Sequence, residues 1–426
     1  MEVLRDLRPN RGLTALLVIT ATVNEMNQSR STEVVFLSAV RTPFGTYGGA
    51  LRDIPVVDFT THAAKVAIER AGIEAADINS TIFGNVLYTA ADSIYFSRHV
   101  SLKAGCRTET PALTLNRLCG SGFQAVVSGA HEILLGDASV CLVGGADSMS
   151  QAPHVARGVR WGVPLGKSAA LEDSLWEALR DSHAGLAMGE TAENLATQYK
   201  LDRGCVDEFA LRSQQLARDA WAANAFADEV ISMPVRNPKT KKTEMFERDE
   251  HMRPDTTIEA LGKLKPVFRE DGVVTAGNAS GIGDGAAVLV IASAEFARER
   301  GLKPLGRLVS YGIAGVDPKI MGIGPVPAAR NALQSAGLGL QDMDVIEVNE
   351  AFAPQACAVE RELGIPRDKL NRQGGAIALS HPLAASGARI TAHLLHTLRA
   401  EGKRYGLGSA CIGGGQGIAL IVEALH

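Results

Sequence analysis

The sequence predicts an α/β fold built from two related halves, and three observations support this. Apolar runs of strand length alternate with segments of helix length along most of the chain, which is the pattern of a layered α/β protein. The chain has 426 residues, of which 46% are hydrophobic, so it is long enough to bury a large core. A segment that begins at Ala71 also recurs from Ala336.

Strands and helices follow one another through the first half. Residues 34–40 form an apolar, β-branched run typical of a strand buried on both faces, and turn residues at 41–45 end it. The elements expected next are a helix at 56–71, a strand at 78–83, a helix at 93–104, a strand at 112–115 that leads into a further helix, and a strand at 140–145. Alternation at this spacing predicts a largely parallel sheet.

Residues 151–278 break this alternation. They contain the three tryptophans of the chain, a long polar helix at 207–224 and a loop rich in proline and lysine at 234–242. The α/β pattern then resumes, with strands expected at 286–291, 304–311, 345–348 and 418–423 and a helix at 327–336. We therefore expect a leader or upstream extension at 1–32, a first repeat at 33–150, an inserted loop subdomain at 151–282 and a second repeat at 283–426.

The second half repeats the first at three places. Residues 71–85 align without a gap on residues 336–350, and the same offset in numbering places Ser121-Gly122 on Ser386-Gly387. With a short further insertion, residues 141–145 align on residues 411–415. Two copies of one unit would pack about a pseudo-dyad, so helices that begin near Cys119 and near His381 are expected to face a shared site.

Composition and charge exclude several classes of protein. The net charge of −4 gives no sign of a protein that binds nucleic acid or a membrane surface. The six cysteines are scattered, with no C-x-x-C pair and no His/Cys cluster at zinc spacing, which indicates a reducing compartment and predicts no metal site.

Residues 1–32 allow two interpretations. The apolar run at 13–19 is too short to span a bilayer, so we expect no membrane span there. Four arginines are compatible with a mitochondrial transit peptide, but three acidic residues argue against one. An upstream extension, with the true start at Met26, is the favoured alternative. The expected location is the cytoplasm, or the mitochondrial matrix if the leader is a transit peptide.

Residues 116–122 read as a cysteine on a tight turn that opens a helix. Gly120 and Gly122 permit a sharp bend, and small apolar residues follow. N–H groups at the start of a helix favour the thiolate of Cys119, which is the form that attacks a carbonyl carbon. Cysteine is also a common small core residue, so these residues alone leave both interpretations open.

Three segments of the second half carry reactive groups beside small residues: 349–352, with Asn349; 380–387, with His381; and 411–417, with Cys411. A histidine between glycine-rich turns can deprotonate a cysteine, backbone N–H groups in glycine loops can stabilise an oxyanion, and a second cysteine can act as acid and base. Each segment alone has an ordinary structural explanation. Together, and in a repeated architecture, they predict catalysis.

These motifs, with residues 41–45, 145–150, 275–281 and 284–287, resemble those of the thiolase family from about residue 33 to the C-terminus. The likeness is closest to 3-ketoacyl-CoA thiolases of the mitochondrial or bacterial β-oxidation type. The resemblance implies a thiolase-like two-repeat, five-layer αβαβα architecture with the inserted loop subdomain. It also implies thiolytic cleavage of 3-ketoacyl-CoA by coenzyme A, through an acyl-cysteine intermediate.

The resemblance also implies roles for individual residues. Cys119 would be the nucleophile and His381 its base. Cys411 would protonate the departing acetyl-CoA enolate and afterwards deprotonate the incoming coenzyme A. Asn349 and the N–H groups of Cys119 and Gly413 would form oxyanion sites. The residues implied along the pantetheine channel are Met188, Ala276, Ser280 and Phe352. Lys239, Lys241 and Lys242 could meet the phosphates of coenzyme A, or form a solvated hairpin tip.

Cofactors and partners follow from the same resemblance. The family needs no metal and no cofactor, with coenzyme A as a substrate, and it implies a homodimer or homotetramer and a possible association with a β-oxidation multienzyme subunit. Alternatives are a biosynthetic, acetoacetyl-CoA-forming thiolase, a related condensing enzyme, and a non-catalytic acyl-CoA-binding subunit. Cys411 argues against a condensing enzyme, and Ala187, where acetoacetyl-CoA-specific relatives have histidine, favours the degradative type.

The chain departs from the family pattern near the histidine. Ser380 and Ala384 stand where glycine is common, and Gln373 stands where asparagine is frequent. We expect these side chains to narrow or tilt the wall opposite Cys119 without removing a reactive group.

Overall fold

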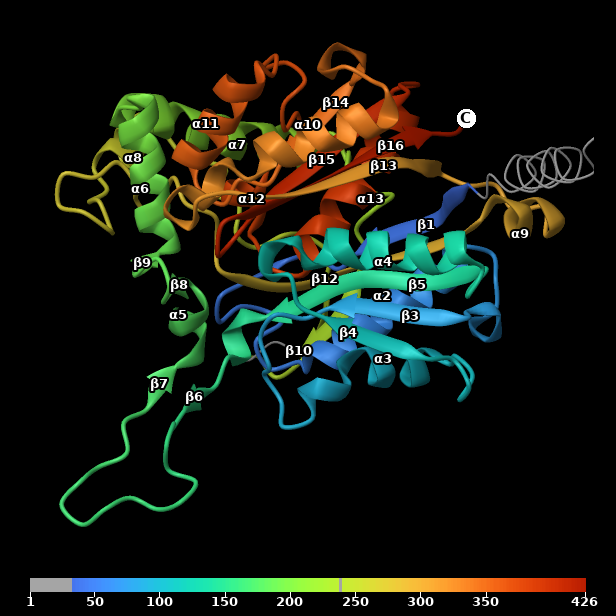
Figure 1. Ribbon diagram of the computed structural model, residues 1–426, viewed down its shortest axis with the longest axis horizontal. Coiled ribbons are helices and arrows are strands. Elements are labelled where there is room, and N and C mark those ends of the chain that lie inside the picture. Colours follow the sequence, from blue (N-terminus) through green and yellow to red (C-terminus); the bar gives the residue numbers. More distant parts are fainter. Residues whose placement is uncertain (1–32, 237–239) are drawn as a thin grey trace, which may run out of the picture.

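The computed structural model describes residues 33–236 and 240–426. The predicted leader and Lys239 lie outside these residues. Among the described residues the largest sheet has ten strands, and its main path runs β4-β3-β5-β12-β1 and then β13-β16-β15-β14 (Figure 1). The two halves join where β1 and β13 pair at only two positions, Val35 with Arg307 and Phe36 with Gly306. The strand order of the second half thus mirrors that of the first.

Corresponding elements make up the two halves. The first contains β1 (Val34–Arg41), α2 (Val56–Arg70), β3 (Ser80–Gly84), α3 (Phe96–Ala104), β4 (Ala112–Leu115), α4 (Ser121–Leu135), β5 (Val140–Ser148) and β12 (Gly283–Ser293). The second contains β13 (Gly306–Gly315), α10 (Pro325–Ala336), β14 (Val345–Val348), α11 (Ala353–Leu363), α12 (Ala376–Leu379), α13 (Ala385–Ala400), β15 (Tyr405–Ile412) and β16 (Gln416–Ala424). The short β2 (Gly45–Thr46) pairs with β12, and α9 (Ala294–Glu299) connects β12 to β13.

Helices and sheet halves stack in five layers. Helices α2 and α3 cover the outer face of the first half, α10 and α11 cover that of the second, and α4 and α13 lie between the halves (Figure 1). The two central helices touch at glycines that the repeat alignment pairs: a Cβ on Gly122 would lie 2.5 Å from the Ala388 nitrogen, and one on Gly387 would lie 2.3 Å from the Phe123 nitrogen. Any side chain there would force the helices apart. The predicted αβαβα fold is confirmed.

The sheet is mixed, so the expectation of a largely parallel sheet is wrong. Only the pairs β3–β4, β3–β5 and β14–β15 are parallel among the described strands. Strands β12 and β16 return beside β5 and β15 in the antiparallel direction. Apolar runs in both kinds of strand are buried on both faces, which is why the sequence pattern did not distinguish them.

The register of the repeat differs from the third sequence alignment. In the first half Ser80 pairs with Cys141, and in the second Val345 pairs with Gly406, so both strands keep the offset that aligns Ala71 with Ala336. Cys141 therefore corresponds to Gly406, and the alignment of 141–145 on 411–415 is wrong. The sequence alignment had matched two glycine runs that occupy different kinds of structure. Gly145 lies within β5, whereas Gly414, with a φ of +80°, lies in the turn between β15 and β16.

A long insertion separates β5 from β12. Its elements are β6 (His154–Val155), β7 (Glu172–Asp173), α5 (Ser174–Ala178), β8 (Arg180–Asp181), β9 (Leu186–Ala187), α6 (Met188–Tyr199), α7 (Arg203–Ala222), β10 (Met233–Arg236), β11 (Thr243–Phe246) and α8 (Ile258–Gly262). Residues 154–173 form an arm that projects from the body (Figure 1).

Strand β12 pairs with β1 and β5. The boundary expected before residue 283 put β12 in the second repeat, and we propose instead that it completes the first.

No helix in the described part of the chain is long and apolar enough to cross a membrane.

Candidate active site

Cys119 lies on a short 3₁₀ turn, Leu118–Gly120, that leads directly into α4. Its predecessor, Leu118, has a φ of +47°, a strained value for a residue with a Cβ. Side chains stabilise the turn: Asn116 Oδ1 accepts a hydrogen bond from the Leu118 N–H (2.9 Å), and Ser121 Oγ donates to the Leu118 carbonyl (2.7 Å). The local sequence therefore fixes the position of the thiol, as expected for a functional turn.

A narrow cavity of about 60 Å³ contains the thiol and residues from both repeats and from the insertion. Six of the predicted site residues line it: Cys119, Met188, Ser280, Phe352, His381 and Gly413. The rest of its lining is small or apolar, from Leu118, Ala178, Leu179, Met321, Ala351 and Leu383. The fold thus brings together groups that lie far apart in the sequence.

The thiol of Cys119 is not pre-ionised. Burial raises its pKa to about 11, although the N–H groups of Gly413 and of Cys119 itself act in the opposite direction. The N–H groups act in the direction expected for a helix start, but the loss of water on burial outweighs them. A base must take the proton when the sulfur attacks.

His381 can be that base. Its Nδ1 lies 2.5 Å from Ser386 Oγ, which donates to the Pro382 carbonyl (3.2 Å), and its Nε2 lies 3.4 Å from Asn349 Nδ2. An amide nitrogen can only donate, so Nε2 accepts and the ring proton belongs on Nδ1. Burial, with a smaller contribution from Arg389, lowers the pKa of His381 to about 4. The imidazole is therefore neutral at neutral pH, with an unprotonated Nε2 that can take a proton.

Cys411 and Asn349 lie behind the wall of the cavity. Cys411 is fully buried at the end of β15 and packs against Met188, Met321, Ala351 and Phe352, all of which line the cavity. Burial, and then the nearby Cys119, raise the pKa of Cys411 far above that of an ordinary thiol. Asn349 Oδ1 is a buried acceptor that has no hydrogen-bond partner among the described residues. Both groups can therefore exchange hydrogen bonds or protons with a bound ligand.

Ala276 lies apart from the thiol, in a second cavity of about 310 Å³ that also contains His251, Arg253, Ala260 and Leu264. Ala276 and Ser280 belong to the same loop, so this loop borders both cavities. Lys241 and Lys242 lie exposed near the tip of the β10–β11 hairpin, and neither lines this cavity. The cation at the second cavity is Arg253, which the sequence analysis missed.

Asp147 is a second residue that the sequence analysis missed. Its Oδ2 accepts a hydrogen bond from the Ala384 N–H (2.7 Å), in the segment between His381 and α13, and its Oδ1 accepts from the N–H groups of Val86 (2.9 Å) and Leu87 (3.0 Å). The carboxylate thereby ties the first repeat to the segment that carries the histidine. Burial raises the pKa of Asp147 to about 7 against these N–H groups. A buried aspartate at the end of a strand gave no sequence signal of this contact.

Ser380 and Ala384, which depart from the family pattern, lie outside the cavity of Cys119. Ser380 has a φ of +86°, and its hydroxyl donates to the Gly281 carbonyl (3.0 Å). Neither Ser380 nor Ala384 lines the cavity of Cys119. These two side chains therefore do not narrow this cavity, because the serine hydroxyl turns toward the 281–283 backbone, and the expected tilt of the wall stays a prediction.

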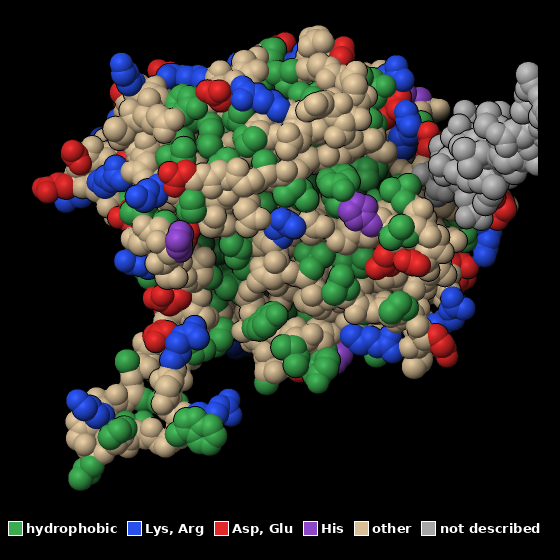
Figure 2. Space-filling view, in the orientation of Figure 1, with side chains coloured by type: hydrophobic (Ala, Val, Ile, Leu, Met, Phe, Trp, Pro, Cys, Tyr) green, Lys and Arg blue, Asp and Glu red, His purple; other side chains and the backbone are tan. Residues whose placement is uncertain are grey.

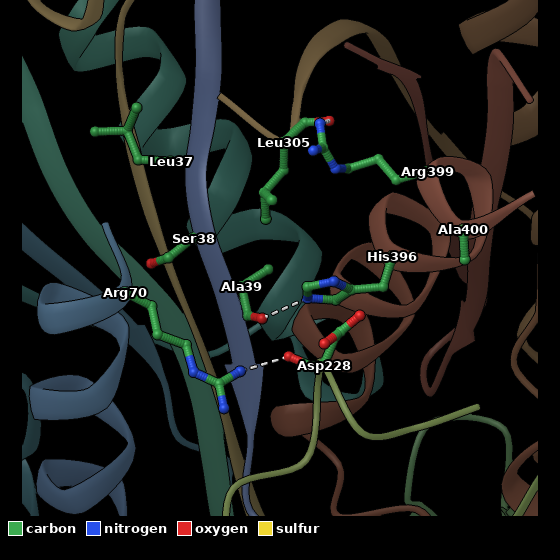
Figure 3. Close-up of a pocket in the computed structure, with 9 residues that line it drawn as sticks. All are labelled: Leu37, Ser38, Ala39, Arg70, Asp228, Leu305, His396, Arg399 and Ala400. Carbon is green, nitrogen blue, oxygen red and sulfur yellow. Dashed lines mark hydrogen bonds between the residues drawn. The ribbon is translucent and has the colours of Figure 1, made fainter. Parts of the chain in front are cut away.

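A larger cavity, of about 540 Å³, lies at the other end of α13 (Figure 3). It contains Arg70, His396 and Arg399, about 20 Å along the helix from its start. The polar groups there bond to backbone: Arg70 donates to the Asp228 carbonyl, and His396 Nε2 lies 2.8 Å from the Ala39 carbonyl oxygen (Figure 3). None of the described residues that line this cavity is a cysteine, so it does not extend the site around Cys119.

Comparison with known proteins agrees with this arrangement. Residues 34–295 match the thiolase N-terminal domain, and residues 302–424 match the thiolase C-terminal domain. The chain is 53% identical to human mitochondrial 3-ketoacyl-CoA thiolase over 92% of its length and 98% of the relative. It is 44% identical to an acetyl-CoA acetyltransferase of Chromobacterium violaceum, over 92% and 99% of the two chains.

A crystal structure of human mitochondrial 3-ketoacyl-CoA thiolase in complex with CoA superposes with a TM-score of 0.90, at 52% identity, covering 92% of this chain and 98% of that one. Two domain matches that span nearly all described residues, high identity over the full length and the same fold lead to one conclusion: the chain belongs to the thiolase family.

Proposed function

We propose that the chain is a 3-ketoacyl-CoA thiolase, which cleaves 3-ketoacyl-CoA with coenzyme A to acetyl-CoA and an acyl-CoA shortened by two carbons. The observation that carries this proposal is the shared cavity of Cys119 and His381, with Cys411 directly behind its wall. Incubation of the purified protein with 3-ketoacyl-CoAs and coenzyme A tests it. Release of acetyl-CoA supports the proposal, and absence of cleavage at every chain length excludes it.

The first half-reaction forms the acyl-enzyme. His381 Nε2 takes the Cys119 proton as the sulfur attacks the 3-keto carbon, and the N–H groups of Cys119 and Gly413, which already contact the sulfur, stabilise the oxyanion. The bond between the α-carbon and the keto carbon then breaks. The acyl group stays on Cys119, and the electron pair leaves as the enolate of acetyl-CoA.

The enolate must be protonated before it leaves. Cys411 supplies this proton, and His381 with a water held by Asn349 stabilises the thioester oxygen while it carries the charge. The free acceptor on Asn349 supports this role, because Oδ1 can accept a hydrogen bond from such a water. Cys411 then deprotonates the incoming coenzyme A, whose sulfur attacks the acyl group. These steps use thiols, imidazole and N–H groups, with coenzyme A as the substrate and no further cofactor.

Coenzyme A would lie along the loop that borders both cavities. Pantetheine would pass from Met188, Ser280 and Phe352 at the thiol toward Ala276, and Arg253 would meet a phosphate in the second cavity. The same arrangement suits a protein of net negative charge, because it concentrates positive charge at the ligand.

Replacing Arg253 with alanine is expected to raise the KM for coenzyme A by roughly 10- to 150-fold, because a charge-assisted hydrogen bond contributes about 1.5–3 kcal/mol. The kcat should change little, since Arg253 is not part of the thiol cavity. Steady-state kinetics with varied coenzyme A measure both constants. Lys241→Ala and Lys242→Ala serve as comparisons: a larger effect from either lysine would move the phosphate site to the hairpin.

Replacing Asp147 with asparagine is expected to lower kcat by about 10- to 100-fold with KM nearly unchanged, because small displacements of a catalytic group have effects of this size. An amide has one acceptor oxygen and cannot receive both the Ala384 N–H and the N–H groups of Val86 and Leu87. Asp284→Asn is the matched control, since Asp284 is equally buried but accepts from the Ser150 N–H. Equal losses in both variants, or a rise in KM alone, would contradict a positioning role for Asp147.

The degradative direction with longer chains is favoured over acetoacetyl-CoA synthesis. Ala187, at the start of α6, presents no imidazole beside Met188, and the wall of the cavity at Met321, Leu179 and Leu383 is apolar, as a fatty acyl chain requires. An activity profile across acyl lengths decides this. Cleavage confined to acetoacetyl-CoA would favour the biosynthetic alternative.

We also propose that copies of the chain assemble through the arm at 154–173. Trp161, Leu165 and Leu171 on it are 93%, 105% and 68% exposed, and Figure 2 shows hydrophobic side chains gathered there. Exposed apolar side chains of this kind mark an interaction surface. A homodimer or homotetramer is expected by light scattering. Trp161→Ser with Leu165→Ser should reduce the assembly, and an unchanged mass would exclude the arm as its contact.

The mitochondrial location in the human relative's name belongs to that protein. For this chain we propose the cytoplasm, or the mitochondrial matrix if residues 1–32 are removed as a transit peptide. Mass spectrometry of the native N-terminus distinguishes the two: a start near residue 33 indicates a matrix protein, and a start at Met1 or Met26 indicates a cytoplasmic one. A β-oxidation multienzyme subunit is a further proposed partner, testable by co-purification.

A further inference from the structure

Two cysteines meet away from the catalytic cavity, where α7 packs against α11. Cys205 lies on the first turn of α7, and Cys357 lies in the middle of α11. Cys357 is buried, at 1% exposure, whereas Cys205 is partly exposed. Both are free thiols, and Cys205 packs against the buried cluster that contains Cys357. A thiol open to solvent thus lies in contact with one that is protected.

A positively charged side chain, Arg361, lies beside Cys205, the more exposed member of this pair. Arg361 lies one turn after Cys357 on α11, and its Nη2 is 3.8 Å from the Cys205 sulfur. The Tyr199 carbonyl accepts from Nη1 of the same guanidinium (2.9 Å), which holds it in place. Cys205 is also close to the N-terminus of a long helix, α7, whose dipole favours negative charge.

The surroundings of the two thiols shift their pKa values in opposite directions. The neighbouring Cys357 thiol, together with Arg361, lowers the pKa of Cys205 against the effect of burial and of Asp202. The neighbouring Cys205 thiol, and then burial, raise the pKa of Cys357. A partly exposed thiolate beside a second thiol is the arrangement of redox-sensitive cysteine pairs.

We propose that Cys205 and Cys357 form a peroxide-reactive pair, in which Cys205 is oxidised first and Cys357 resolves it to a disulfide between α7 and α11. The Cys205 thiolate attacks one oxygen of hydrogen peroxide, the O–O bond breaks, and hydroxide leaves with a sulfenic acid on Cys205. Cys357 then loses its proton, its sulfur attacks the Cys205 sulfur, and the S–O bond breaks. The two thiols are oxidised by two electrons, and the peroxide is reduced to two waters.

The disulfide would join two helices that support the catalytic segment. Ser213 of α7 donates a hydrogen bond to Glu350 Oε2 (2.6 Å), and α11 begins directly after Phe352. Cys106 and Cys141 provide internal comparisons, because both are buried free thiols whose pKa is raised by burial. Neither should react at the rate of Cys205.

The test is peroxide oxidation of the reduced full-length protein at neutral pH, followed by alkylation of the remaining thiols and peptide mass spectrometry. The Cys119→Ala variant is treated in parallel, which removes the thiol at the catalytic cavity. We expect a peptide pair linked through Cys205 and Cys357, formed several-fold faster than Cys106 or Cys141 is consumed. In Cys357→Ser, dimedone should trap a sulfenic acid on Cys205, and Arg361→Gln should slow its oxidation several-fold.

Three results would overturn the proposal. The first is consumption of Cys205 no faster than that of Cys106 and Cys141. The second is oxidation of Cys205 to a sulfinic acid with no link to Cys357, which would exclude the resolving role. The third is an unchanged oxidation rate in Arg361→Gln, provided that circular dichroism shows a folded variant, which would remove the electrostatic basis of the pair's reactivity.

Discussion

Replacing Cys119 with alanine is expected to abolish the acyl-enzyme and to lower thiolysis by at least about 10⁴-fold, because loss of a nucleophile removes the covalent route altogether. Among the described residues that line the cavity, Cys119 is the one cysteine. Cys411 is fully buried behind the wall, where the proposed mechanism uses it for proton transfer alone. The measurement is release of acetyl-CoA from a 3-ketoacyl-CoA in the presence of coenzyme A.

Cys141→Ala is the matched control for this substitution. Cys141 is a buried thiol on β5, in contact with the Gly129 carbonyl and not among the residues that line the cavity. The control should lose some stability, about 1 kcal/mol for a small cavity, and retain activity. Turnover by Cys119→Ala at a rate near that of the control would mean that another group attacks the substrate.

Replacing Cys411 with alanine is expected to separate acyl transfer from carbon–carbon bond cleavage. The variant should still accept an acyl group from acyl-CoA, at a reduced rate, because the coenzyme A thiolate is a far weaker base than the enolate and can leave without the proton that Cys411 supplies. Cleavage of a 3-ketoacyl-CoA should fall by about 10²–10⁴-fold, the usual contribution of a positioned acid, because the acetyl-CoA enolate needs a proton from Cys411. Formation of the acyl-enzyme and release of acetyl-CoA are followed in the same samples.

Cys357→Ala provides the comparison for Cys411, since it removes an equally buried thiol on α11 that does not line the cavity. It should leave both half-reactions intact. Parallel losses of acyl transfer and cleavage in Cys411→Ala would show that the substitution disturbs Cys119 itself. A normal cleavage rate would assign the enolate proton to another group.

Much of the fold could be predicted from the sequence because local and long-range patterns agree. Apolar runs located the strands, and the repeat that pairs Ser121-Gly122 with Ser386-Gly387 anticipated the contact of Gly122 with Gly387 between the central helices. The direction of β12 and β16 could not be predicted, because a strand buried on both faces has the same composition in parallel and antiparallel pairs. The alignment of β5 on β15 was wrong because the glycines of β5 lie within a strand, whereas those after β15 form a turn.

The sequence predicted which residues form the candidate site better than it predicted their pKa values. Reactive side chains flanked by glycines are visible in the sequence, and six of the predicted residues line one cavity. The pKa of Cys119 was expected to fall and is instead raised, because only the fold shows that desolvation of the thiol outweighs the N–H groups around it. Arg253 carried no local signal, and Asp147 lay within the 145–150 motif with no sign of its contact. The importance of both comes from neighbours in distant parts of the sequence, such as Ala276 and Ala384.

The central claim is that Cys119 carries the acyl group while Cys411 transfers the proton. Mass spectrometry of the wild-type protein, quenched with acid during turnover of a 3-ketoacyl-CoA, tests it most directly. We predict an acyl adduct on the peptide that contains Cys119 and an unmodified peptide for Cys411. An adduct on Cys411, with Cys119 free, would contradict the account.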